Sequence, residues 1–66
     1  MNQLNNADMD FEEYLISKKI SPEKFRREDP ATFDDWKHDF QFINPDSFTV
    51  QKKFLINKIR RMYIAD

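Results

Sequence analysis

Four residues close together, Asp34, Asp35, His38 and Asp39, come nearest to a reactive site in this chain. Asp34 and His38 are four residues apart, so on a helix they share a face and could together contact a metal ion. Two ligands from one helix make a weak site, because structural zinc takes four. No nucleophile accompanies His38 in the pattern of a catalytic triad. The residues therefore favour a solvated Asp34–His38 pair, and we expect no catalytic residue, no metal site, no cofactor and no enzymatic activity.

Other kinds of site are limited by composition. The chain has 66 residues, no cysteine, one histidine and no glycine. Without cysteine there is no disulfide or thiolate-bound metal, and without glycine there is no P-loop or dinucleotide-binding fingerprint. The absence of glycine also disfavours β-hairpins, and turns that need a positive φ should use Asn or Asp, or be avoided.

Helix starts are the most clearly marked structural feature. Ser21, Asp29 and Asn44 each precede a proline, and proline suits the first position of a helix that such a residue caps. Asp10 begins a capping-box pattern with Glu13. These signals predict helices over about 11–19 and 22–28, a third after Asp29, and a long fourth that ends near residue 63. The start of the fourth is open between residues 44 and 47.

The predicted fold is an all-α bundle of three to four helices, one of them short. Residues 9–64 are expected to form a single helical domain, and the polar residues 1–8 a disordered N-terminus. A stripe of Phe33, Trp36, Phe40 and Ile43 at helical spacing predicts a buried face with Trp36 in it. The expected core consists of Phe11, Leu15, Phe33, Trp36, Phe40, Leu55, Ile59 and Met62.

Phe42 and Phe54 lie off the main apolar stripe of their helices. Two alternatives stay open for them: a second layer of the core, or an exposed apolar patch that marks a protein interface.

Charge is segregated along the chain. Six Lys/Arg against eleven Asp/Glu give residues 1–46 a net charge of −5, whereas residues 47–65 hold five Lys/Arg and no acid, for +5. The basic segment could pair internally with the acidic helices, or face an acidic protein or a nucleic acid. The overall charge of −1 is unlike that of a dedicated nucleic-acid module.

Three segments carry a resemblance to known proteins: Phe11-Glu12-Glu13-Tyr14-Leu15, Ser47-Phe48-Thr49 and the stretch from Phe54 to Arg61. In them the chain resembles a group of short bacterial proteins to which no activity is attached. The resemblance implies a small free-standing protein and transfers no site residues.

The expected function is that of a non-enzymatic protein-interaction module, a monomer or weak homodimer in the cytoplasm with an unidentified protein partner. Without a basic leader or an apolar run of about 20 residues, no membrane association is expected. The alternative is weak nucleic-acid binding by the basic face of the last helix, through Lys52, Lys53, Lys58, Arg60 and Arg61. The candidate interaction surface comprises Phe42, Phe54, Lys53, Lys58, Arg60 and Arg61.

Overall fold

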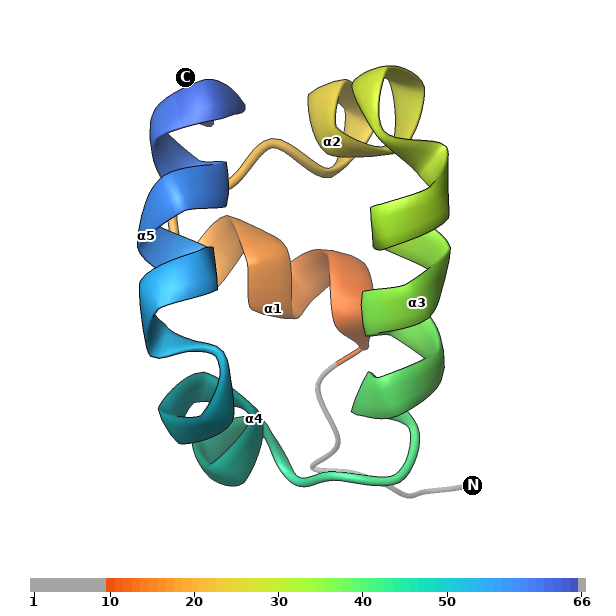
Figure 1. Cartoon of the computed structure of the whole chain (residues 1–66), viewed down its shortest axis with the longest axis vertical. Coiled ribbons are helices and arrows are strands. Elements are labelled where there is room, and N and C mark those ends of the chain that lie inside the picture. The colour runs from red at the N-terminus through yellow and green to blue at the C-terminus, as the bar shows by residue number, and fades with distance from the viewer. Residues whose placement is uncertain (1–9, 66) are drawn as a thin grey trace.

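The computed structural model describes residues 10–65, and these form five helices joined by short connections. The prediction of an all-α fold is confirmed, but the predicted count of three to four helices is wrong. The predicted disordered tail at residues 1–8 lies outside the described residues. Helices α3 and α5 lie on opposite sides of the molecule, and α1 crosses between them (Figure 1). The five helices are α1 (Phe11–Ser17), α2 (Pro22–Glu28), α3 (Pro30–Phe40), α4 (Pro45–Gln51) and α5 (Lys53–Met62).

The four predicted helix starts are confirmed. The Asp10 carboxylate accepts a hydrogen bond from the Glu13 backbone N–H at 2.9 Å, and the Glu13 side chain completes the capping box. Ser21, Asp29 and Asn44 accept in the same way from the backbone three residues later, each with proline at the first helical position. Asn44, rather than a residue near position 47, therefore caps the start of α4.

The predicted long last helix is divided at Lys52, which has φ −112° and ψ 23°. The Lys52 ammonium lies 3.3 Å from the Asp39 carboxylate and over the rings of Trp36 and Phe48. Cation–π contact and a half-buried ion pair both favour this position. Two short helices with a change of direction between them consequently replace one long rod, and α3, with 11 residues, is the longest helix described.

The turn after α1 uses a lysine where glycine is usual. Lys19 has φ 66°, a left-handed conformation that costs about 1–2 kcal/mol for a residue with a Cβ. Its N–H donates to the Ile16 carbonyl at 2.9 Å, and the Ile20 N–H donates to the Leu15 carbonyl at 2.9 Å. These two bonds are those of a Schellman motif. The expectation that positive φ would fall on Asn or Asp is wrong, because burial of Leu15 and Ile20 stabilises the turn.

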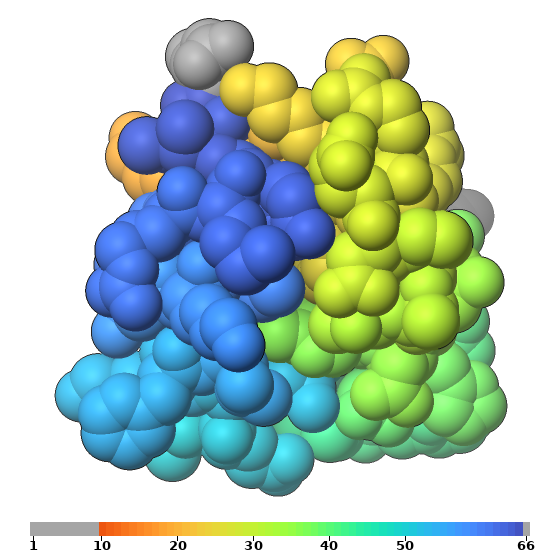
Figure 2. Space-filling model, turned by 45° about the horizontal axis from the view of Figure 1, so that its top comes forward, coloured from red at the N-terminus to blue at the C-terminus, as the bar shows by residue number. Residues whose placement is uncertain are grey.

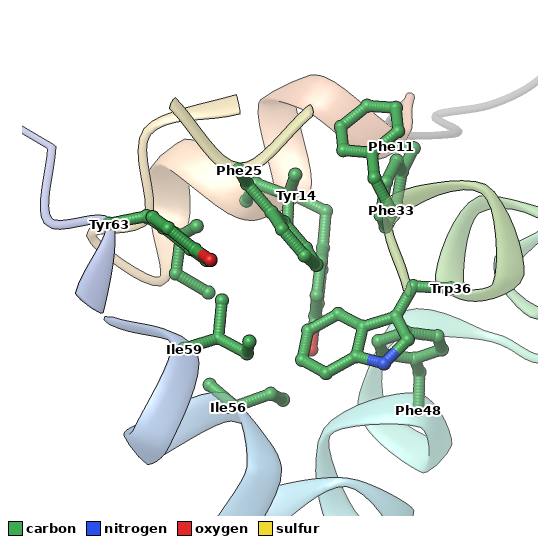
Figure 3. Packing of buried hydrophobic residues seen from close by; sticks show 11 residues of the cluster. Phe11, Tyr14, Phe25, Phe33, Trp36, Phe48, Ile56, Ile59 and Tyr63 are labelled. Carbon is green, nitrogen blue, oxygen red and sulfur yellow. The ribbon is translucent and has the colours of Figure 1, made fainter. Parts of the chain in front are cut away.

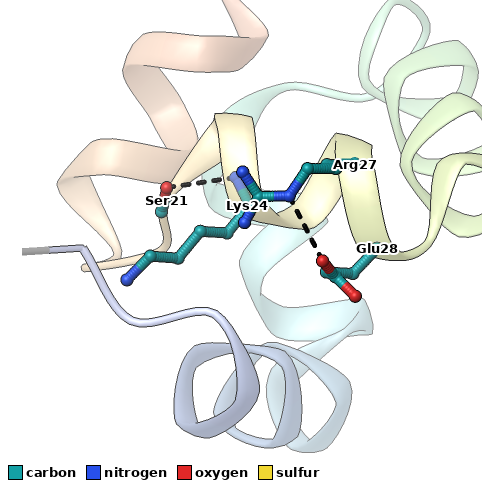
Figure 4. A network of polar contacts seen from close by, with 4 residues as sticks. All are labelled: Ser21, Lys24, Arg27 and Glu28. Carbon is teal, nitrogen blue, oxygen red and sulfur yellow. Dashed lines mark hydrogen bonds and ion pairs between the residues drawn. The ribbon is translucent and has the colours of Figure 1, made fainter.

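The segment after α5 returns to the turn between α1 and α2. Ile20 and Ile64 form an isolated antiparallel bridge. The Ser21 N–H donates to the Tyr63 carbonyl at 2.7 Å, and the Ala65 N–H donates to the Lys19 carbonyl at 2.9 Å. The Lys24 ammonium also donates a hydrogen bond to the Ile64 carbonyl at 3.2 Å. Lys24 belongs to α2, and Figure 4 shows the Ser21 cap and the Arg27–Glu28 ion pair of this helix. This two-segment clamp, residues 19–21 with residues 63–65, fixes the end of α5.

The core is mainly aromatic and draws on all five helices (Figure 3). Phe25 lies at its centre with no exposed surface, and its ring contacts those of Phe33, Trp36 and Tyr63. The predicted burial of Trp36 is confirmed. The buried residues are Phe11, Tyr14, Leu15, Ile20, Phe25, Phe33, Trp36, Phe48, Ile56, Ile59 and Tyr63, with Phe40 and Ile43 packed against them.

Two residues assigned to the core from the sequence, Leu55 and Met62, are exposed. Successive helical residues are rotated by about 100°. Because Ile56, Ile59 and Tyr63 point inward, their neighbours Leu55 and Met62 are turned toward solvent. The prediction that both belong to the core is wrong.

A hydroxyl chain joins α1 to α4. The Thr49 hydroxyl donates its proton to the Pro45 carbonyl at 2.9 Å. The Tyr14 hydroxyl lies 2.5 Å from the same Thr49 oxygen and must therefore be the donor in that second bond. Burial, and to a lesser extent the charge of Asp46, raises the pKa of the Tyr14 hydroxyl above its ordinary value.

We expect this raised pKa to make the protein less stable in alkali. Above about pH 10 the unfolded chain releases the Tyr14 proton while the folded chain retains it, so the free energy of unfolding falls as pH rises through the folded-state pKa. The stabilisation is fully present below pH 10. Thermal melts of the parent and of Tyr14→Phe from pH 8 to 11 measure the effect. The decline should be smaller in Tyr14→Phe, since lysine titration is common to both, and an identical decline in the two proteins would contradict the assignment.

Candidate interaction surface

The residues proposed from the sequence for an interaction surface come from two separate segments of the fold. Phe42 and Phe54 are 74% and 85% exposed, so the alternative of a second core layer is excluded for both. Phe42 follows α3, whereas Phe54 lies on α5 on the other side of α1 (Figure 1). The Phe42 ring packs edge-on against His38 at 5.2 Å, and no ring pair among residues 10–65 includes Phe54. Phe42 is therefore separate from the basic helix.

Helix α5 presents the larger set of exposed residues. Its inward side carries Ile56 and Ile59, and the exposed residues on its other side are spaced at three, four and seven positions, which places them on one face. Leu55 and Met62 are 50% and 54% exposed there. We call this set the α5 outer face: Phe54, Leu55, Lys58, Arg61 and Met62.

The position of α5 leaves this face open to solvent. Figure 2 shows α4 and α5 along one side of the molecule and α2 and α3 along the other. The outer face does not take part in the core, because Ile56, Ile59 and Tyr63 make that contact. A partner could therefore cover the outer face without any rearrangement of the bundle.

Most of the basic charge of the last segment is not neutralised within the fold. Lys52 is paired with Asp39, and the Arg60 guanidinium donates to the Asn57 side chain at 2.5 Å. Within the described part of the chain, Lys53, Lys58 and Arg61 have no carboxylate within 4.0 Å. An ion pair within the described fold therefore neutralises only one of the five basic side chains, that of Lys52. Lys53, Lys58 and Arg61 are exposed and Arg60 is half-buried.

The carboxylates around His38 do not assemble into a site. Across residues 10–65 no group of three or more His, Asp or Glu side chains could hold a metal ion. Asp34 and His38 form no ion pair in the described structure, and His38 packs on Phe42 instead. The expected Asp34–His38 pair is therefore not formed.

A hollow lies over α4 and offers little chemistry. Asp46, Ser47, Val50 and Gln51 line it. Its one carboxylate has no titratable neighbour among these lining residues, so the hollow has no acid–base pair.

Among residues 10–65, none of the helices has the length and apolar character needed to cross a membrane. Comparison of the chain with protein-family models, with curated proteins and with solved structures gives no match. The candidate surface therefore rests on its own geometry.

Sequence reasoning found the cations and Phe54 but missed Leu55 and Met62. Both were assigned to the core because they fall in the same broad apolar sector as Ile56 and Ile59. The signal that separates them is Tyr63, which is buried and shifts the inward direction of α5 away from Leu55 and Met62. The apolar residues of α5 point partly toward the core and partly toward solvent. Which of them face the core can be decided only when the packing partner, here Phe25, is known.

Proposed function

We propose that this chain is a non-enzymatic module of the cytoplasm that binds another protein through the α5 outer face. The observation that carries the proposal is the exposure of Phe54, Leu55 and Met62 on one side of a helix whose other side is in the core. Exposed apolar groups that cluster, rather than scatter, are typical of interaction sites. That the chain belongs to the group of short bacterial proteins that it resembles is part of the same proposal.

The composition of the face also fits protein interfaces. Aromatic residues, methionine and arginine are enriched at such interfaces, and the face contributes Phe54, Met62 and Arg61. Energetically dominant interface residues are often aromatic or arginine. Phe54 is therefore the residue whose loss should matter most for association.

Phe54→Ser is expected to abolish association with the natural partner and to leave the fold intact. Because the ring is almost fully exposed, its removal should change the melting temperature by no more than about 2 °C. The measurement is affinity capture from cells of the source organism with the parent, Phe54→Ser and the matched control Phe42→Ser. A protein captured by the parent and by Phe42→Ser but not by Phe54→Ser supports the proposal. Identical capture by all three contradicts it.

Weak nucleic-acid binding by the same helix is the second candidate. Phe54 beside Lys53, Lys58 and Arg61 combines an exposed ring with unpaired cations, as stacking surfaces for single strands do. Of the five cations that sequence analysis assigned to this function, however, Lys52 is held by Asp39 and Arg60 by Asn57. Three remaining cations give few phosphate contacts, and affinity for nucleic acid depends on their number.

A further inference from the structure

We infer that the partner presents an acidic amphipathic helix that packs lengthwise against the α5 outer face. This inference rests on the proposed function and adds the chemistry of the partner. Helix α5 has ten residues and is about 15 Å long. Its exposed side chains form a ridge at the three- and four-residue spacings along which helices pack against one another. An amphipathic helix can pack lengthwise on such a ridge by its own apolar face.

The charge of the ridge determines the charge of the partner. Lys58 lies midway along the face, with Phe54 and Leu55 before it and Arg61 and Met62 after it. A partner that covers Leu55 and Met62 must also cover Lys58. A cation removed from water without a counter-charge is strongly destabilising. Since no carboxylate of the described chain lies within 4.0 Å of Lys58 or Arg61, the partner must supply one or more.

A second copy of this chain does not meet that requirement at the same face. Two copies related by a two-fold axis would bring Lys58 of one near Lys58 of the other, and the face has no acidic residue to separate them. Contact between this face and an acidic surface of another copy would be heterologous, and would give rings or open chains of molecules rather than a two-fold dimer. Self-association through α5 is therefore disfavoured.

A nucleic acid satisfies the charge but not the apolar residues. Phosphate groups would neutralise Lys58 and Arg61, and a base could stack on Phe54. Leu55 and Met62 would remain uncovered by such a ligand, although they are two of the three exposed apolar residues of the face. An acidic amphipathic helix covers both kinds of residue.

Defined probes test the inference directly. Three labelled helical peptides of equal length are used: one with a leucine face flanked by glutamate, one with the same face flanked by lysine, and one in which serine replaces leucine in the glutamate peptide. A labelled single-stranded RNA is the fourth probe, and fluorescence anisotropy at 150 mM salt is the measurement. The leucine–glutamate peptide should bind about 10-fold or more tightly than any other probe.

The variants locate the interaction. Lys58→Glu should weaken binding of the leucine–glutamate peptide by about 10-fold or more, and Lys58→Glu with Arg61→Glu should reverse the preference toward the leucine–lysine peptide. Lys37→Glu, an exposed residue of α3 with the same change in charge, is the matched control and should leave binding unchanged. Melting temperatures confirm that each variant is folded.

The inference would be overturned by equal binding of the glutamate and lysine peptides, by equal effects of Lys58→Glu and Lys37→Glu, or by tighter binding of the RNA. Concentration-dependent growth in mass by light scattering, abolished by Lys58→Glu, would overturn it in favour of self-association. If peptide preference is absent but capture still depends on Phe54, the acidic helix is wrong and the proposed function stands. If capture does not depend on Phe54, the proposed function itself fails.

Discussion

Phe25→Ala is expected to leave the protein largely unfolded at room temperature. The ring has no exposed surface and contacts Phe33, Trp36 and Tyr63 at centroid distances of 5.3–5.6 Å. Truncation of a buried phenylalanine to alanine typically costs about 3–5 kcal/mol. A domain of this size has a free energy of unfolding of only a few kcal/mol, and the chain has no disulfide to add to it. One substitution is therefore comparable to the whole stability.

Trp36, the single tryptophan, reports the result. It is 3% exposed in the fold and contacts Phe25 directly. Its emission should be at short wavelength in the parent and should shift to longer wavelength in Phe25→Ala without denaturant. Phe54→Ala is the matched control, because it removes the same ring from an exposed position and should give the parent's spectrum and melt. A cooperative melt of Phe25→Ala near that of the parent would show that the aromatic centre is not what holds the bundle together.

Tyr63→Ala is expected to give the second largest loss, about 3 kcal/mol by analogy with other buried aromatic residues. The Tyr63 ring stacks on Phe25 with an interplanar angle of 14° and lies directly after α5. Its removal opens the core at the point where the end of α5 meets the turn after α1. A loss of this size corresponds to a fall in melting temperature of about 12–24 °C.

Tyr63→Phe is the control for this variant. Within residues 10–65 the Tyr63 hydroxyl makes no hydrogen bond, so its loss should change the melting temperature by only about 2 °C. A thermal melt by circular dichroism distinguishes the two variants. If Tyr63→Phe were as unstable as Tyr63→Ala, the hydroxyl rather than the stacked ring would be responsible.

The local part of the fold was predictable from the sequence. Each helix start from α1 to α4 depends on one side chain and a backbone N–H three residues later, so Asp10, Ser21, Asp29 and Asn44 could be identified without knowledge of the rest of the molecule. Helix α5 has no side-chain cap. Its start depends on where Lys52 lies relative to Asp39, Trp36 and Phe48, which are distant in sequence or on another helix.

The positive φ at Lys19 was not predictable for a similar reason. Lysine carries no local preference for this conformation, and the turn is stabilised by two backbone hydrogen bonds and the burial of Leu15 and Ile20. The candidate surface was predictable in part. Phe54 and the unpaired cations were identified from their spacing and charge, whereas Leu55 and Met62 required the direction in which α5 meets the core.

The bridge between Ile20 and Ile64 links residues near the two ends of the described chain. A nascent chain emerging from the ribosome cannot make this link until Ile64 has been synthesised. Before then α1 and α2 lack Tyr63, Ile59 and Ile56, which complete their core. Formation of such a distant contact is slow compared with that of a helical turn. The protein should therefore acquire its fold after translation of α5 and not progressively from its N-terminus, and during that interval chaperones and proteases encounter a chain whose aromatic residues are still accessible.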